Sequence, residues 1–196
     1  MNKFFTTLAF AIIAFSASAQ YGGPRFFWDI PSIYATTPDV SMISRRVGVG
    51  AETAMNVAGH WWTTRVGGGV TFTLDPKAEE VGESFLTTPY LLLEGGAGLY
   101  RTNGKRCAQT NANAFTVMPV IGLRYNFDTR SLAPAGDTEG YGLLWGVGGE
   151  IGYFFIRDMF RNTEFVLRGT YWPETKLVSA NFGFKVFLNL REMGRY

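Results

Sequence analysis

The sequence is short of the residues that most often carry catalysis, metal binding or disulfide bonds. Its 196 residues include one cysteine, Cys107, and one histidine, His60. A single cysteine cannot form an internal disulfide, so Cys107, in a predicted turn, is expected to be a free thiol or to pair with another molecule. No metal-ligand spacing, phosphate-binding loop or nucleophile motif is present. The sequence therefore predicts no enzyme, no metal site and no cofactor.

A strong net charge and long internal apolar runs are also missing. Beyond residue 19 the chain has 17 basic and 16 acidic residues, because residues 1–19 contain one lysine and no acid. This balance gives no reason to expect a nucleic-acid partner. After the N-terminus, no apolar run approaches the roughly 20 residues that a membrane-spanning helix needs. If the protein spans a membrane, it is expected to do so with strands.

The N-terminus has the pattern of a cleaved export signal. Lys3 provides a positive charge, Phe4–Phe15 is a short apolar run, and Ala17-Ser18-Ala19 is a small-x-small cleavage sequence. We therefore predict a signal peptide over 1–19 and an exported domain over 20–196; an uncleaved membrane anchor is the alternative. The Ala-Ser-Ala-Gln sequence at this site resembles that of exported proteins of Bacteroidota.

A two-residue alternation runs through Tyr141–Phe155, and the rest of the chain repeats it. Alternate side chains of a strand point to opposite faces. One face of this stretch is apolar with aromatics near both ends, and the other is glycine-rich with one carboxylate, Glu150. A glycine-rich face makes a poor surface towards water. The pattern favours an apolar outer face against lipid and a small, polar inner face.

Seven further stretches show the same alternation and are predicted to be strands. The first is expected to be cut short by Pro31, because proline cannot donate to a strand ladder. Asn56–Gly59 is expected to be a turn, and Pro119 is expected to cause a bulge or an interruption. The seven stretches are Arg25–Ile30, Arg45–Ala54, Trp61–Leu74, Phe85–Arg101, Ala114–Phe127, Thr163–Trp172 and Lys176–Leu190.

Lipid forbids open sheet edges, and eight is the smallest even strand number of bacterial outer-membrane barrels. The sequence therefore predicts an all-β fold, a closed antiparallel transmembrane β-barrel of about eight strands.

With these features the chain resembles the small outer-membrane β-barrel proteins of the OmpA and OmpX type. The resemblance covers about Arg25 to Leu190 and rests on the signal peptide, the alternating strands and the aromatic-rich terminal strand Phe182–Phe187. The family usually ends on an aromatic residue, whereas here Asn189–Arg195 follow that strand before Tyr196. The resemblance implies an outer-membrane location and contact with outer-membrane lipids and the barrel-insertion machinery. It also implies a structural or interaction role: envelope integrity, adhesion, or a subunit that binds other envelope proteins.

The predicted inner faces carry about one charge per strand, with both signs alternating along the chain. The interior of a barrel of about eight strands is just wide enough for side chains to fill. Charges buried there must be paired and hydrogen-bonded. We therefore expect pairs between neighbouring strands to plug the lumen, with Glu164 nearer a strand end. The predicted network consists of Glu52, Arg65, Glu94, Arg124, Glu150, Arg168 and Lys185.

Other functions remain open. Exchange of the charge pairs could create a narrow porin-like, ion-conducting path. A soluble, lipocalin-like ligand-binding barrel would invert the two faces, and its outside would then be rich in glycine.

Some barrels of the resembled family modify lipids with serine and histidine. His60, however, is predicted at a periplasmic turn beside Trp61 and Trp62, where an interfacial aromatic belt is expected. Glu94 and Glu150 could do acid–base work, but arginine partners would keep both ionised.

Overall fold

The computed structural model describes residues 25–38, 40, 47–59, 61–74, 86–102, 113–128, 142–155 and 162–190. The predicted signal peptide, His60 and Cys107 lie outside these residues. All nine elements within them are strands, and no helix among them is long and apolar enough to cross a membrane. The strands are β1 (Arg25–Thr37), β2 (Val47–Ala58), β3 (Trp62–Leu74), β4 (Leu86–Ala97), β5 (Leu99–Thr102), β6 (Ala114–Asn126), β7 (Leu143–Phe155), β8 (Thr163–Trp172) and β9 (Leu177–Asn189).

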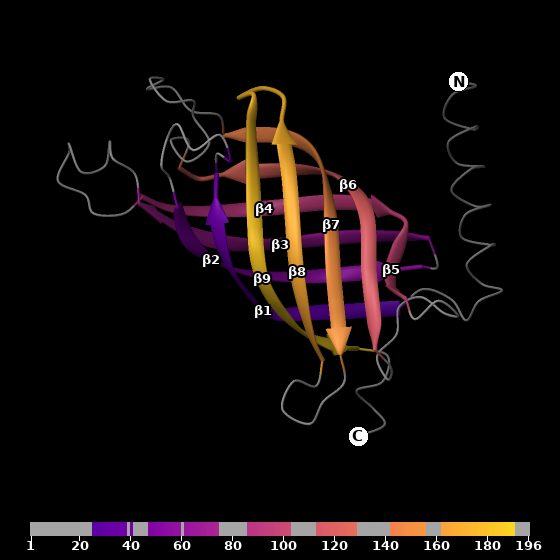
Figure 1. Ribbon diagram of the computed structural model, residues 1–196. Coiled ribbons are helices and arrows are strands. Elements are labelled where there is room, and N and C mark those ends of the chain that lie inside the picture. Colours follow the sequence, from indigo (N-terminus) through magenta and orange to yellow (C-terminus); the bar gives the residue numbers. More distant parts are fainter. Residues whose placement is uncertain are drawn as a thin grey trace, which may run out of the picture.

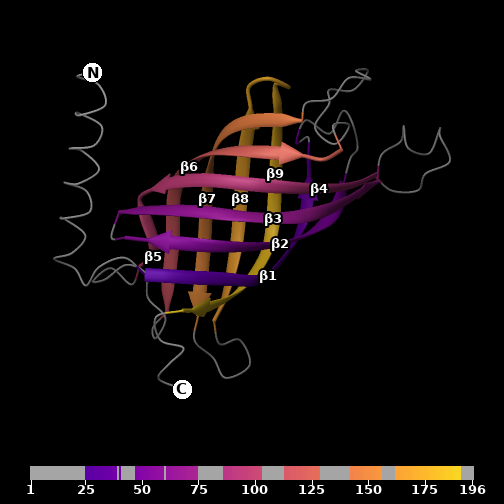
Figure 2. The ribbon, with the colours of Figure 1, turned by 180° about the vertical axis from the view of Figure 1, so that it is seen from behind.

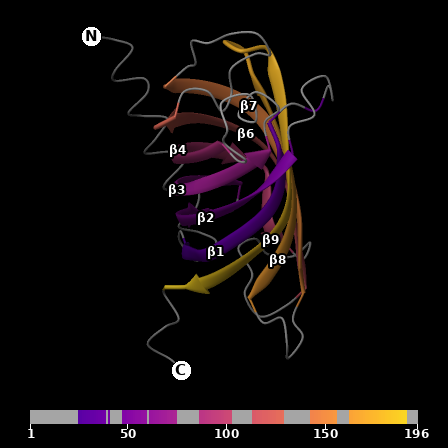
Figure 3. The ribbon, with the colours of Figure 1, turned by 90° about the vertical axis from the view of Figure 1, so that its left-hand side faces the viewer.

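The strands close into one antiparallel barrel, which confirms the predicted fold class. The hydrogen-bonded order is β4-β3-β2-β1-β9-β8-β7-β6-β5, and β4 also pairs with β6. Because β4 and β5 are successive parts of one wall strand, the barrel has eight strands, and the last lies beside the first. In Figures 1 and 2, β1–β4 and β7–β9 form facing walls whose strands cross, and Figure 3 shows both walls from the side. Strands inclined to the barrel axis produce this crossing.

The two ends of the barrel differ in what they carry. β1 begins and β9 ends at one end, which we call the terminal mouth; the opposite end is the loop mouth. A buried apolar cluster lies towards the terminal mouth and includes Phe27, Tyr100, Phe154 and Phe187. Towards the loop mouth, Leu144 packs on Trp172. The interior between these two groups is mostly polar.

β1 is longer than predicted, because Pro31 does not end it. The strand continues to Thr37, and its register shifts by one residue between Asp29 and Ser32 against both β2 and β9. The extra residue is a β-bulge, which accommodates a residue that cannot donate to the ladder. It also changes which side chains face inwards, so that Asp29 before the bulge and Ser32 after it are both buried.

The predicted turn at Asn56–Gly59 was wrong. β2 continues to Ala58, and Asn56 pairs with Phe27 on β1 and Arg65 on β3. Its side chain is 1% exposed and points into the barrel. A short polar residue followed by Gly59 resembles a turn in sequence, but here the amide has partners inside the barrel.

Pro119 does not interrupt the strand that contains it. β6 runs through Pro119, which pairs with Gly149 on β7 without a register shift. The irregularity lies in the neighbour instead: β4 pairs with β6 as far as Gly96, and β5 resumes the pairing at Leu99. The wall strand predicted as one piece over Phe85–Arg101 is therefore broken opposite the proline.

Candidate functional site

The interior carries balanced charge. Apart from Arg25 at the first position of β1, the described strands place five acidic and five basic side chains inside the barrel. All are buried except Arg124, which is half-buried. Equal numbers allow the interior to be neutral without other ions, as buried charges require. The acidic residues are Asp29, Glu52, Glu94, Glu150 and Glu164, and the basic residues are Arg65, Arg101, Arg124, Arg168 and Lys185.

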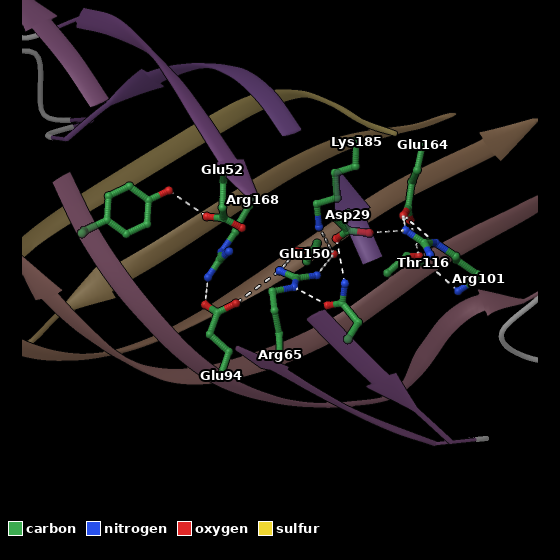
Figure 4. Close-up of polar contacts among 12 residues, drawn as sticks. Asp29, Glu52, Arg65, Glu94, Arg101, Thr116, Glu150, Glu164, Arg168 and Lys185 are labelled. Carbon is green, nitrogen blue, oxygen red and sulfur yellow. Dashed lines mark hydrogen bonds and ion pairs between the residues drawn. The ribbon is translucent and has the colours of Figure 1, made fainter. Parts of the chain in front are cut away.

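Arg65 of β3 forms the centre of the interior network (Figure 4). Its Nη1 and Nη2 donate to the two carboxylate oxygens of Glu150 on the facing wall, at 2.9 and 3.0 Å. Nη1 also lies 3.2 Å from Glu94 Oε2, and Nε donates to Asn56 Oδ1 at 2.8 Å. The bidentate pair matches the planar fork of the guanidinium to a carboxylate. This pair crosses the lumen from β3 to β7 and joins the two walls.

Two further cations complete this central layer. Lys185 Nζ on β9 donates to Glu150 Oε1 at 2.9 Å, so Glu150 is bound by two cations. Arg168 Nη2 on β8 pairs with Glu94 Oε1 on β4. Arg65 and Glu94 are opposite each other on neighbouring strands. The other three pairs, Arg65–Glu150, Lys185–Glu150 and Arg168–Glu94, instead join strands that are not adjacent. The expectation of pairing between neighbouring strands therefore describes only part of the network.

A second cluster is centred on Arg101 of β5, towards the terminal mouth. Its guanidinium pairs with Glu164 Oε2 on β8 at 2.8 Å and with Asp29 Oδ1 on β1 at 3.3 Å. It lies 3.5 Å from the ring centre of Phe187, within cation–π distance. Thr116 donates to the other oxygen of Glu164, at 2.5 Å. Asn56 Nδ2 donates to Asp29 Oδ2, which links this cluster to the central layer.

A third cluster lies on the loop-mouth side of the central layer. The Tyr90 hydroxyl donates to Glu52 Oε2 at 2.7 Å and shares a 2.5 Å hydrogen bond with the Tyr34 hydroxyl. The guanidinium of Arg124 lies over the Tyr90 ring. Arg124 Nε donates to Asn126 Oδ1 at 2.7 Å. Side chains of β1, β2, β4 and β6 meet in this cluster.

One cavity inside the barrel is small. This cavity of about 30 Å³ is lined by residues that include Ser32, Tyr34, Glu52, Arg168 and Lys185. Such a volume holds about one or two water molecules. Ser32 Oγ and Arg168 Nε line it and have no hydrogen-bond partner among the described residues. The described residues form no group of three or more His, Cys, Asp or Glu able to hold a metal ion. This geometry joins the walls and leaves room for about one or two water molecules.

Comparisons of the chain with protein-family models, with curated proteins and with solved structures found no match. The assignment of a function therefore depends on the geometry of the barrel itself.

The structure brings most of the predicted network together. Arg65, Glu94, Glu150, Arg168 and Lys185 share the central layer, whereas Glu52 and Arg124 lie with the two tyrosines in the third cluster.

The sequence prediction missed three residues of the network, Asp29, Asn56 and Arg101. Asp29 lies on the inner face of the stretch expected to be the least regular strand, and Asn56 was assigned to a turn. Glu164, by contrast, was expected inside the barrel near a strand end, and it is buried at the second position of β8. Arg101 gives no signal in the alternation, because strict alternation from Glu94 directs it outwards. Its backbone φ of 45° departs from the extended strand and accompanies its burial inside.

The outer face has the opposite composition. In the described strands, no Asp, Glu, Lys or Arg side chain is exposed, whereas large apolar side chains are exposed on every strand from β1 to β4 and from β6 to β9. Four outward aromatics, Phe115, Tyr153, Phe165 and Phe184, are register partners across β6–β9 towards the terminal mouth. Other exposed aromatics lie near the loop-mouth ends of their strands, among them Phe72, Tyr125, Trp145 and Tyr171.

Proposed function

We propose that the protein is an integral outer-membrane β-barrel, of the small OmpA and OmpX type and of Bacteroidota type, with a structural or interaction role. The proposed roles are envelope integrity, adhesion or service as a subunit of an envelope complex. Outer-membrane lipids and the barrel-insertion machinery are then its first partners, and other envelope proteins are further ones.

One observation carries this proposal: the distribution of charge between the two faces. A water-soluble protein keeps most Asp, Glu, Lys and Arg side chains at its surface. Here the described strands turn these residues inwards and expose aliphatic and aromatic side chains instead. In water, burying charged side chains and exposing apolar ones are both unfavourable. Against hydrocarbon, both are favourable.

The outward aromatics support the same proposal. Barrels of outer membranes have an apolar band between two girdles of aromatic residues that lie at the membrane interfaces. Phe115, Tyr153, Phe165 and Phe184 form a continuous row towards one end of the strands. Leu93, Ile121, Ile151 and Leu167 are among the aliphatic residues exposed nearer the middle.

The filled interior favours a structural or interaction role over transport. Arg65 and Glu150 are at most 1% exposed, and their contact joins opposite walls across the lumen. A lipocalin-like role needs a ligand cavity lined by apolar side chains, and small-molecule sites measure about 300–1,000 Å³. The cavity of about 30 Å³ beside Arg168 is far smaller, and its lining includes the charged Glu52 and Lys185.

The runner-up function, a narrow channel, can be tested directly. We expect the protein reconstituted in planar bilayers to give no steady conductance, because the paired charges fill the lumen. Heat-modifiable migration on gels shows in parallel that the reconstituted protein is folded. Steady channels that disappear in Arg168→Gln would favour the channel and contradict the plugged lumen. Channels unaffected by Arg168→Gln and Arg124→Gln would indicate a contaminating porin, and the preparation would be repeated from a porin-deficient strain.

A further inference from the structure

The wall strand made by β4 and β5 is unlike the other seven. It breaks at Gly98, whose φ of +132° is a conformation that residues with a side chain rarely adopt. The Gly98 amide donates to the carbonyl of Trp61, the residue before β3, at 2.9 Å. Beyond it, β5 pairs within the described residues only with β6, and its register shifts between Leu99 and Thr102.

β5 places consecutive side chains inside the barrel, which a regular wall strand does not do. Tyr100 and Arg101 are 1% and 0% exposed. Tyr100 packs edge-on against Phe27, at 5.9 Å between ring centres, and joins the apolar cluster at the terminal mouth. Arg101 lies behind it against Phe187 and reaches Asp29 and Glu164. β5 thus closes the mouth with an aromatic ring and a paired cation.

We propose that β5 is a hinged strap that closes the terminal mouth, with Gly98 as the hinge and Arg101 as the latch. The Arg65–Glu150 pair includes no residue of β5 and is linked to Arg101 through Asn56 and Asp29. Opening of the strap would therefore expose a blind vestibule and would not open a channel. The inference concerns the barrel alone and does not depend on the proposed role in the envelope.

The charges explain why the closed position is favoured. Withdrawal of β5 would take Arg101 from Asp29 and Glu164 and leave two carboxylates in a mouth lined by Phe27 and Phe187. Unpaired charges in such surroundings are costly. Two polar atoms of β5, Tyr100 Oη and Arg101 Nη1, are buried and have no hydrogen-bond partner among the described residues. The strap is therefore held by a few strong contacts at a place where the ladder is interrupted.

Thiol labelling of a position beneath the strap tests the proposal. Ala58 is 1% exposed and shares the apolar cluster with Tyr100. On a Cys107→Ser background in detergent, Ala58→Cys is expected to be protected from a water-soluble thiol reagent. Adding Gly98→Ala is expected to raise its labelling rate at least tenfold. The new Cβ would lie 2.8 Å from the Val117 carbonyl oxygen and would disfavour the hinge conformation, while leaving every charge in place.

The chain offers a matched control for the hinge substitution. Gly95 lies three residues earlier on the same wall strand, and a Cβ there meets nothing within 4 Å. Gly95→Ala should leave the labelling of Ala58→Cys unchanged. A thiol at Ser179, buried near the loop mouth beside Trp172, should stay protected in both variants.

The outcomes of this experiment are distinct. Equal labelling with Gly98→Ala and Gly95→Ala would overturn the strap, as would a matching rise at Ser179→Cys, which indicates general loosening. If Gly98→Ala does not fold, Arg101→Gln replaces it with the same expectation, and Arg101→Lys should restore part of the protection. Failure of Arg101→Gln to raise labelling would also overturn the proposal.

Discussion

Replacing Arg65 by methionine is expected to lower the free energy of unfolding by about 3–5 kcal/mol, the usual cost of removing one partner of a buried ion pair. Methionine fills much of the same space but cannot donate to Glu150, Glu94 or Asn56, the three partners of the guanidinium. The interior would then hold one uncompensated negative charge. Urea unfolding of the protein in lipid vesicles, followed by tryptophan fluorescence, measures the loss.

A double-mutant cycle distinguishes charge imbalance from lost packing. Arg65→Met with Glu150→Gln restores equal numbers of acidic and basic residues in the interior. The double variant is therefore expected to lose less than the sum of the single losses, with a coupling of about 1–3 kcal/mol. Lys176→Gln, in the exposed turn after Trp172, removes a cation without an interior role and should change the free energy by less than about 0.5 kcal/mol. Strict additivity of the two interior substitutions would contradict the network.

Replacing Leu167 by arginine is expected to destabilise the protein by about 2–4 kcal/mol in lipid, the cost of a cation near the bilayer midplane on a barrel's outer face. Leu167 lies in the middle of β8, points outwards and is 51% exposed. Because Leu167 is exposed, the cost of the substitution depends on whether water or lipid surrounds it. At an exposed position in water, such a substitution would change stability by less than about 0.5 kcal/mol.

Leu74 provides the matched control for depth. It is also an outward leucine, 47% exposed, but it is the last residue of β3 at the loop mouth. Leu74→Arg would lie near the interface and should cost about 0–1 kcal/mol. The difference between the two arginine variants, measured by the same urea unfolding, reports the depth of the outer face. Equal and small effects would contradict a membrane location.

The strand pattern could be predicted from sequence because most positions of the wall strands obey one simple rule. Alternation places Glu150 inside and Ile151 outside, and the structure agrees for both. Ile121 and Leu167 likewise point outwards from the strands that flank β7. Closure was predicted because lipid forbids open sheet edges.

The rule fails where a residue is added or the backbone leaves the extended conformation. The bulge at Pro31 lets Asp29 and Ser32 face the same side, and the φ of 45° at Arg101 accompanies its burial where alternation would direct it outwards. Both departures bring charged or polar groups into the interior. Partners across the lumen, such as Arg65 and Glu150, depend on the width of the barrel. Spacing along the chain does not contain that information.

The dependence of folding on lipid tests the central claim, that the outer face of this barrel lies in a membrane. The full chain, unfolded in urea, is diluted into buffer with or without phospholipid vesicles, and folding is read by heat-modifiable migration on gels. Buried charges and an uncharged outer face predict that the folded, fast-migrating form appears only with vesicles. A monomeric folded barrel formed in buffer alone, without lipid or detergent, would contradict the claim.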